Sequence, residues 1–144
     1  MGIHKTRILE KFDYAKQYLK ELDIVLENTM ERFREEIPLQ LMGERLFEIL
    51  SQIMLDVCTH IIAKLELGTP RDYADCLKKL SSNEMRILQK EDAERLQNII
   101  KMRNLVVHQY VAVDHEILFN ALPLIKSDFE MYRNAIIAWM ENLD

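Results

Sequence analysis

The feature that most constrains the fold is a segment from about Leu39 to Leu67, which includes RLFEILSQIMLDVCTHIIAKLEL. Its apolar residues fall on nearly every side of a helix, so its amphipathic character is weak. Such a helix has to be buried on more than one side, as the central helix of a bundle is. Pro38 is placed to begin this helix at its first turn, and Gly68 is placed to cap its end.

Three further segments carry the three- and four-residue apolar spacing of amphipathic helices. They run from about His4 to Arg34, from Glu91 to Val107, and from the capping residue Asp114 to Glu141. Pro123 should kink or split the last of them, because a proline at that depth removes a backbone hydrogen bond. Two short helices are expected near residues 71–80 and 84–88, the second one capped within SSNE.

The composition supports a single domain over residues 1–144. Only 3 Gly and 3 Pro are present, which disfavours a turn-rich β fold. The prediction is therefore an all-α, up-and-down bundle of four main helices plus short helices. A chain of this size buries roughly two-thirds of its unfolded surface and needs no disulfide or metal for stability. Cys58 and Cys76 lack C-x-x-C spacing, so we expect free, buried thiols in a reducing compartment.

The net charge is −5, which argues against wholesale coating of nucleic acid but leaves room for a small basic cleft. No apolar run approaches the roughly 18 residues of a membrane span. The start of the chain is charged and amphipathic and lacks the apolar region of a signal peptide. A cytoplasmic protein without membrane contact is expected.

The chemically unusual stretch is RNLVVHQY, residues 103–110, where four polar groups stand among valines and a leucine. On a regular helix, the side chains of Arg103, Asn104, His108 and Tyr110 fan over an arc of about 160°. A histidine with a pKa near 6.5 can transfer protons, and a forked guanidinium can stabilise charge on a phosphoryl group. The pair therefore suits RNA cleavage without a metal. Since one chain supplies one such histidine, a two-fold dimer would supply both acid and base.

Other interpretations of these residues stay open on spacing alone. A histidine near a helix end and a single arginine are more often structural than catalytic. Asp56 and His60, four positions apart, either line the same cleft or form a buried hydrogen-bonded pair. A metal site at His115 is disfavoured because further ligands are not found in the sequence. We predict no metal and no cofactor.

RNLVVHQY resembles the R-x4-H-x-Y motif of the HEPN superfamily, specifically its HepT-like branch. Upstream, LDVCTHIIAKLELGTPRDYADCLKKL (residues 55–80) resembles the second helix and the G-x-P-x-x-Y turn of that branch. VAVDHEILFNALP (residues 111–123) resembles the segment that follows the motif. The resemblance covers about residues 40–135 and implies a HEPN-like helical bundle.

The resemblance implies a metal-independent ribonuclease toxin of a type VII-like toxin–antitoxin module, acting on an RNA such as tRNA or mRNA. A homodimer would place two R-x4-H motifs in one cleft, with Arg103 and His108 catalytic and Asn104 supporting. The partner would be a minimal nucleotidyltransferase antitoxin, MntA, which neutralises the toxin by transferring AMP to Tyr110. The alternative is a non-catalytic helical binding partner of that nucleotidyltransferase.

Overall fold

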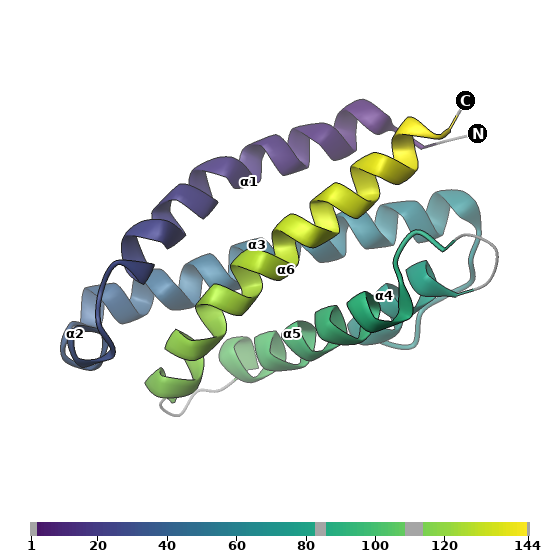
Figure 1. Cartoon of the computed structure of the whole chain (residues 1–144). Helices are drawn as coiled ribbons and strands as arrows, with labels where there is room; N and C mark the ends of the chain where they lie inside the picture. The colour runs from purple at the N-terminus through teal and green to yellow at the C-terminus, as the bar shows by residue number, and fades with distance from the viewer. Residues whose placement is uncertain (1–2, 83–85, 109–113, 144) are drawn as a thin grey trace.

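The computed structural model describes residues 3–82, 86–108 and 114–143, without the side chains of residues 106–108. Every regular element within these ranges is an α-helix. The four long helices are α1 (Lys5–Leu26), α3 (Ile37–Leu65), α5 (Lys90–His108) and α6 (His115–Glu141), and the short ones are α2 (Met30–Glu35) and α4 (Tyr73–Ser81). Successive long helices run in opposite directions and the two termini lie at one end (Figure 1). The predicted all-α bundle is confirmed.

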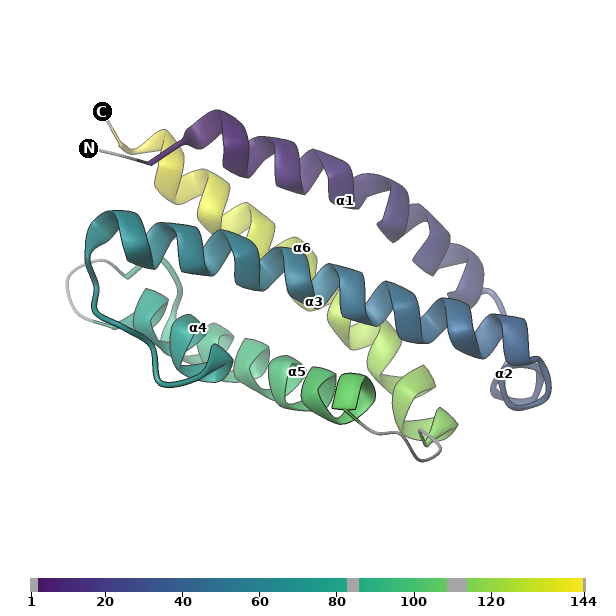
Figure 2. The same ribbon diagram turned by 180° about the vertical axis from the view of Figure 1, so that it is seen from behind.

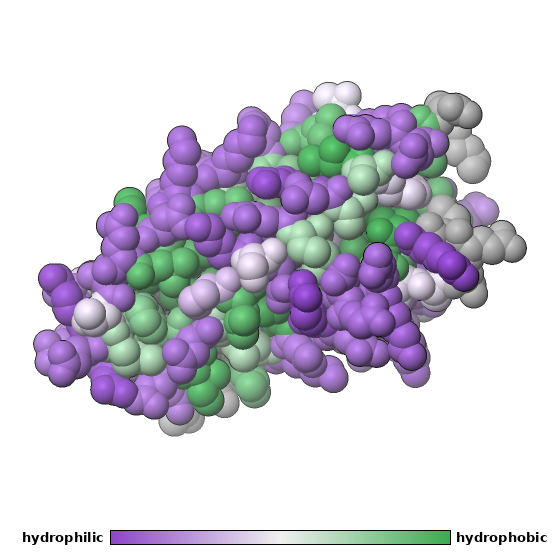
Figure 3. Space-filling model, viewed as in Figure 1, coloured by the Kyte–Doolittle hydropathy of each residue, from purple (hydrophilic) through white to green (hydrophobic). Residues whose placement is uncertain are grey.

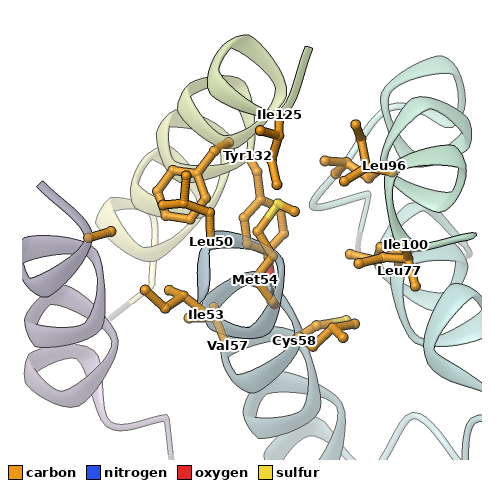
Figure 4. Packing of buried hydrophobic residues seen from close by; sticks show 14 of the residues in the cluster. Leu50, Ile53, Met54, Val57, Cys58, Leu77, Leu96, Ile100, Ile125 and Tyr132 are labelled. Carbon is orange, nitrogen blue, oxygen red and sulfur yellow. Dashed lines mark hydrogen bonds between the residues drawn. The ribbon is translucent and has the colours of Figure 1, made fainter. Parts of the chain in front are cut away.

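Helix α3 lies at the centre of the bundle and packs against each of the other five helices. It has α1 and α6 on one side and α4 and α5 on the other (Figures 2 and 4). Its Leu50, Met54 and Cys58 side chains are fully buried. Contrary to the expectation from sequence, α3 is long and apolar enough to cross a membrane, but 61% of its apolar window is buried inside the protein. The helix therefore has the burial of a core helix.

The first helix is shorter than the apolar spacing predicts, because the chain leaves the helical path after Leu26. Thr29 begins α2, and its side-chain oxygen accepts a hydrogen bond from the backbone N–H of Arg32 at 3.2 Å. Asn28 folds back on α1, where its Nδ2 donates to the carbonyl oxygen of Ile24 at 2.9 Å. The cap formed by Thr29 offsets the backbone hydrogen bonds that are lost between α1 and α2. The prediction of one helix over residues 4–34 was therefore wrong.

The two ends of α3 differ in how well the sequence predicts them. Pro38 lies in its first turn, as expected. At the other end the cap is Glu66, with left-handed backbone at φ 54°, and the expectation that Gly68 caps the helix was wrong. Gly68 has φ 93° and turns the chain toward α4 instead. Glycine suits this position because residues with a Cβ rarely adopt that positive φ.

The second half of the chain follows the predicted helices with two exceptions. The helix expected near residues 84–88 is absent from its described part, residues 86–88, and the remainder lies outside the described residues. Helix α6 begins at the Asp114 cap as predicted, and the Asp114 carboxylate accepts from the N–H groups of Glu116 and Ile117 at 3.0 and 3.2 Å. Pro123 does not split α6, which continues to Glu141. Burial of Leu122 and Ile125, on either side of the proline, offsets the missing hydrogen bond.

Both cysteines are free and buried, as predicted. Cys58 lies on α3 and Cys76 on α4, so the two thiols sit where these helices pack. Burial raises the pKa of the Cys58 thiol, which keeps it protonated and unreactive at neutral pH.

The surface shows mostly hydrophilic residues over α1 and over the α4–α5 pair, with hydrophobic residues between the helices (Figure 3).

Candidate functional site

Arg103 is the one arginine with a buried side chain among the described residues, at 8% exposure. It projects from α5 toward α3, where its Nη2 donates to Oε1 of Gln52 at 2.6 Å. Its guanidinium carbon lies 5.6 Å from the centre of the Tyr73 ring, at the start of α4. Its Nε is buried and has no hydrogen-bond partner among the described residues. A buried guanidinium that has no carboxylate partner among the described residues is suited to bind an anion.

Gln52 connects this arginine to a chain of polar groups that crosses the bundle. Its Nε2 donates to Oδ1 of Asp56 at 2.9 Å, one turn further along α3. The other carboxylate oxygen of Asp56 lies 3.9 Å from Nζ of Lys11, on α1. The amide of Gln52 is thereby held from both ends, and its oxygen is oriented toward Arg103. This network joins α1, α3 and α5 and restricts the rotamers open to the arginine.

His60 lies one turn beyond Asp56 but has different partners. Its Nε2 accepts a hydrogen bond from the backbone N–H of His4 at 3.4 Å, and the two imidazole rings are 5.7 Å apart. Burial lowers the pKa of His60, and nearby cations including Lys64 lower it further. A neutral imidazole is what an acceptor Nε2 requires. Asp56 and His60 therefore share a helix face without forming the hydrogen-bonded pair considered from the sequence.

Asn104 is exposed and borders a pocket of about 300 Å³ next to the arginine. The pocket is formed where the end of α3, the loop before α4, α4 itself and α5 meet. Its lining residues are Thr59, Pro70, Asp72, Tyr73, Cys76 and Asn104. Tyr73 lines this pocket and its ring centre lies 5.6 Å from the guanidinium carbon of Arg103, so a group bound in the pocket would lie close to the guanidinium.

Of the two remaining predicted site residues, the structure places the backbone of His108 and does not describe Tyr110. His108 is the last residue of α5, five positions after Arg103, and its side chain lies outside the described residues. Tyr110 lies outside the described residues altogether. The helix carrying Arg103 does continue to His108, as the motif spacing requires.

Sequence reasoning missed two residues of this site, Gln52 and Tyr73. Gln52 precedes Asp56 by four positions on a predicted helix, so it lies one turn before Asp56 on the helix face that Asp56 and His60 share. That spacing is the sequence signal that could have found it. Tyr73 lies in the G-x-P-x-x-Y turn, but its proximity to Arg103 depends on how α4 packs on α5. Within the described ranges, no three His, Cys, Asp or Glu side chains are grouped closely enough to hold a metal ion. His115 instead packs edge-on against Phe33, with ring centres 6.1 Å apart.

A comparison with known protein families matches most of the chain to one family. Residues 15–136 match the family described as Ribonuclease HepT-like. The chain belongs to the HepT-like family. The match covers Gln52 and Asp56 on α3 as well as Arg103 and His108 on α5, so the site lies within the HepT-like region of the chain.

Two characterised relatives are HepT nucleases. The tRNA nuclease HepT of Aphanizomenon flos-aquae is 24% identical over 143 residues, which cover 99% of this chain and 96% of the relative. The mRNA nuclease HepT of Shewanella oneidensis is 22% identical over 131 residues, which cover 91% of this chain and 96% of the relative. The similarity spans essentially the whole of each HepT protein.

Solved structures show the same fold. A tri-AMPylated Shewanella oneidensis HEPN toxin, solved in complex with its MNT antitoxin, superposes with a TM-score of 0.81 at 22% identity. It covers 91% of this chain and 96% of its own length. The cytosolic protein of unknown function YutE from Bacillus subtilis gives a TM-score of 0.81 at 19% identity, covering 96% and 92% of the two chains. The HepT-like bundle is thus shared at low sequence identity.

Proposed function

We propose that this HepT-like chain is a metal-independent endoribonuclease, the toxin of a toxin–antitoxin pair, acting in the cytoplasm. The observation that carries the proposal is Arg103, a buried guanidinium anchored by Gln52 and with an unpaired Nε–H. Burying a charge this way is costly unless a partner compensates it. A phosphate of bound RNA supplies the counter-charge at the small part of the Arg103 side chain that is exposed. Both relatives described above are RNA nucleases, which supports an RNA substrate.

In the proposed reaction, the ribose 2′-OH attacks the adjacent phosphorus and the bond to the leaving 5′-oxygen breaks. His108 removes the proton from the 2′-OH or donates one to the leaving oxygen. Arg103 stabilises the negative charge that develops on the phosphoryl oxygens. One histidine performs one of the two proton transfers, so the site is completed by His108 of a second copy in a homodimer. Asn104 supports the substrate or the histidine.

We further propose that a minimal nucleotidyltransferase is the antitoxin and that it transfers AMP to Tyr110. The HEPN toxin of Shewanella oneidensis carries AMP groups in its complex with an MNT antitoxin, which supports this partner. An AMP group two residues after His108 would bring an anion toward Arg103. It would repel RNA phosphates and satisfy the guanidinium, so cleavage would stop.

The test is RNA cleavage by the purified protein in EDTA. Wild type is expected to cleave tRNA or mRNA, whereas His108→Ala and Arg103→Ala are expected to lose at least about 100-fold in rate. Mixed dimers of these two variants regain partial activity if the two copies share one site. Equal rates for wild type and His108→Ala would refute the ribonuclease proposal. The chain would then be the non-catalytic partner of the nucleotidyltransferase.

A separate experiment tests the modification. Incubation with the nucleotidyltransferase and ATP is expected to add AMP mass to the peptide that contains Tyr110, and to abolish RNA cleavage. Tyr110→Phe should remain unmodified and active in the presence of the antitoxin. Neutralisation of Tyr110→Phe by AMP transfer elsewhere would contradict the assignment of Tyr110.

A further inference from the structure

Tyr73 is an exposed aromatic residue at the start of α4, a helix whose apolar side chains are otherwise mostly in the core. Its exposed fraction is 47%, whereas Cys76, Leu77 and Leu80 of the same helix are fully buried. Its ring is not needed to fill the core. The ring instead lies beside Arg103, 5.6 Å from the guanidinium carbon. An aromatic ring next to an arginine that binds phosphate is a suitable surface for a base to stack on.

The pocket beside Tyr73 has the size and the chemistry for a planar heterocycle. Its volume of about 300 Å³ lies at the small end of the range for ligand pockets. Asn104 at its rim carries an amide, which can both donate to and accept from a base edge. Asp72 is also at the rim, where its carboxylate caps α4 by accepting from the N–H of Asp75 at 2.7 Å. That negative charge disfavours a phosphate and favours a neutral base.

The geometry points to a nucleobase subsite at Tyr73 and Asn104, which takes the base of the nucleotide whose phosphate is bound by Arg103. This subsite rests on the proposed function and identifies where base preference would arise. Tyr73 stacks on the base, Asn104 contacts its edge, and the buried Arg103 neighbours both. The base comes either from the RNA substrate or from the AMP group that the nucleotidyltransferase transfers.

The first arm of the test measures binding of short 2′-O-methyl oligonucleotides, which cannot be cleaved, by fluorescence anisotropy of the full chain. Tyr73→Ala and Tyr73→Leu are expected to weaken binding about 10-fold, since loss of one stacked base costs about one order of magnitude in affinity. Tyr73→Phe is expected to bind like wild type. Tyr14→Ala is the matched control, because Tyr14 is a similarly exposed tyrosine on α1.

A second series of oligonucleotides, each with one abasic site, separates stacking from an indirect effect through Arg103. When the missing base is the one that would stack on Tyr73, wild type and Tyr73→Leu are expected to bind that oligonucleotide with equal affinity. The ring then has no base to contact. If Tyr73→Leu is weaker by the same factor at every position, the ring acts only on Arg103 and the subsite is refuted.

The second arm measures the rate of AMP incorporation by the nucleotidyltransferase. Slower incorporation in Tyr73→Leu, with unchanged oligonucleotide binding, would assign the subsite to the adenine of AMP. If Tyr73→Leu binds oligonucleotides and incorporates AMP like wild type, the proposal is overturned. It is also overturned if wild type binds no oligonucleotide and incorporates AMP at the same rate as Tyr73→Leu. Because neither arm requires cleavage, a wild type that binds RNA without cutting it would refute the ribonuclease function while leaving the subsite intact.

Discussion

The substitution Gln52→Leu tests whether the polar network across the bundle holds the arginine in place. Gln52 accepts from Nη2 of Arg103 at 2.6 Å and donates to Asp56 at 2.9 Å. A leucine of similar size removes both bonds and leaves the buried guanidinium without its described acceptor. Because a hydrogen bond to a charged group contributes about 1.5–3 kcal/mol, and Gln52 is half-buried, we expect a loss of about 1.5–2 kcal/mol in the free energy of unfolding.

That loss converts into a measurable change in melting temperature. For a chain of 144 residues, the entropy of unfolding is about 0.3 kcal/mol/K. The melting temperature of Gln52→Leu should therefore fall by about 5–7 °C in calorimetry. RNA cleavage should slow by about 10- to 100-fold in kcat, because the arginine leaves the geometry in which it meets the phosphate. Both effects have the same structural origin.

Two further variants make the reasoning refutable. Gln17→Leu makes the same change at an exposed position of α1 and should alter neither property. Gln52→Glu keeps an acceptor for Arg103 but places a like charge beside Asp56, so it should lose stability while retaining more activity than Gln52→Leu. If Gln52→Leu melts and cleaves like wild type, or if Gln52→Glu is no more active than Gln52→Leu, the network does not position the arginine.

Substitutions at three other positions test the bundle itself. Leu50→Ala, at a fully buried position of α3, should cost about 2–5 kcal/mol in calorimetry by removing core contacts and leaving a cavity. Asp114→Ala should lower the melting temperature by about 3 °C through loss of the α6 cap, and Asp114→Ser should restore most of it. Burial raises the pKa of Asp128 despite the ion pair with Arg95, so its ionisation opposes folding above that pKa. Asp128→Asn should therefore melt higher than wild type at pH 7, and thermal scans should show the difference closing as the pH falls below about 4.

The order of the long helices was predictable because local pattern decides it. Apolar spacing, Pro38 and the Asp114 cap act within a few residues of themselves, so they can be read from the sequence. The errors occurred where a local signal competes with packing. Gly68 is a good cap residue, yet α3 ends at Leu65 and Glu66 is its cap. Pro123 is a helix breaker, yet α6 passes through it because Leu122 before it and Ile125 after it are fully buried.

The amino-acid sequence by itself determined the all-α class, the order of the long helices and the five-residue spacing of Arg103 and His108. These depend on side-chain periodicity and on motif spacing along one helix. Only the tertiary structure decided which residues surround the arginine. Gln52 and Tyr73 are 51 and 30 positions from Arg103 in the chain, and they reach it because α3 and α4 pack against α5. Such contacts follow from the relative placement of helices, which no pattern within a single helix encodes.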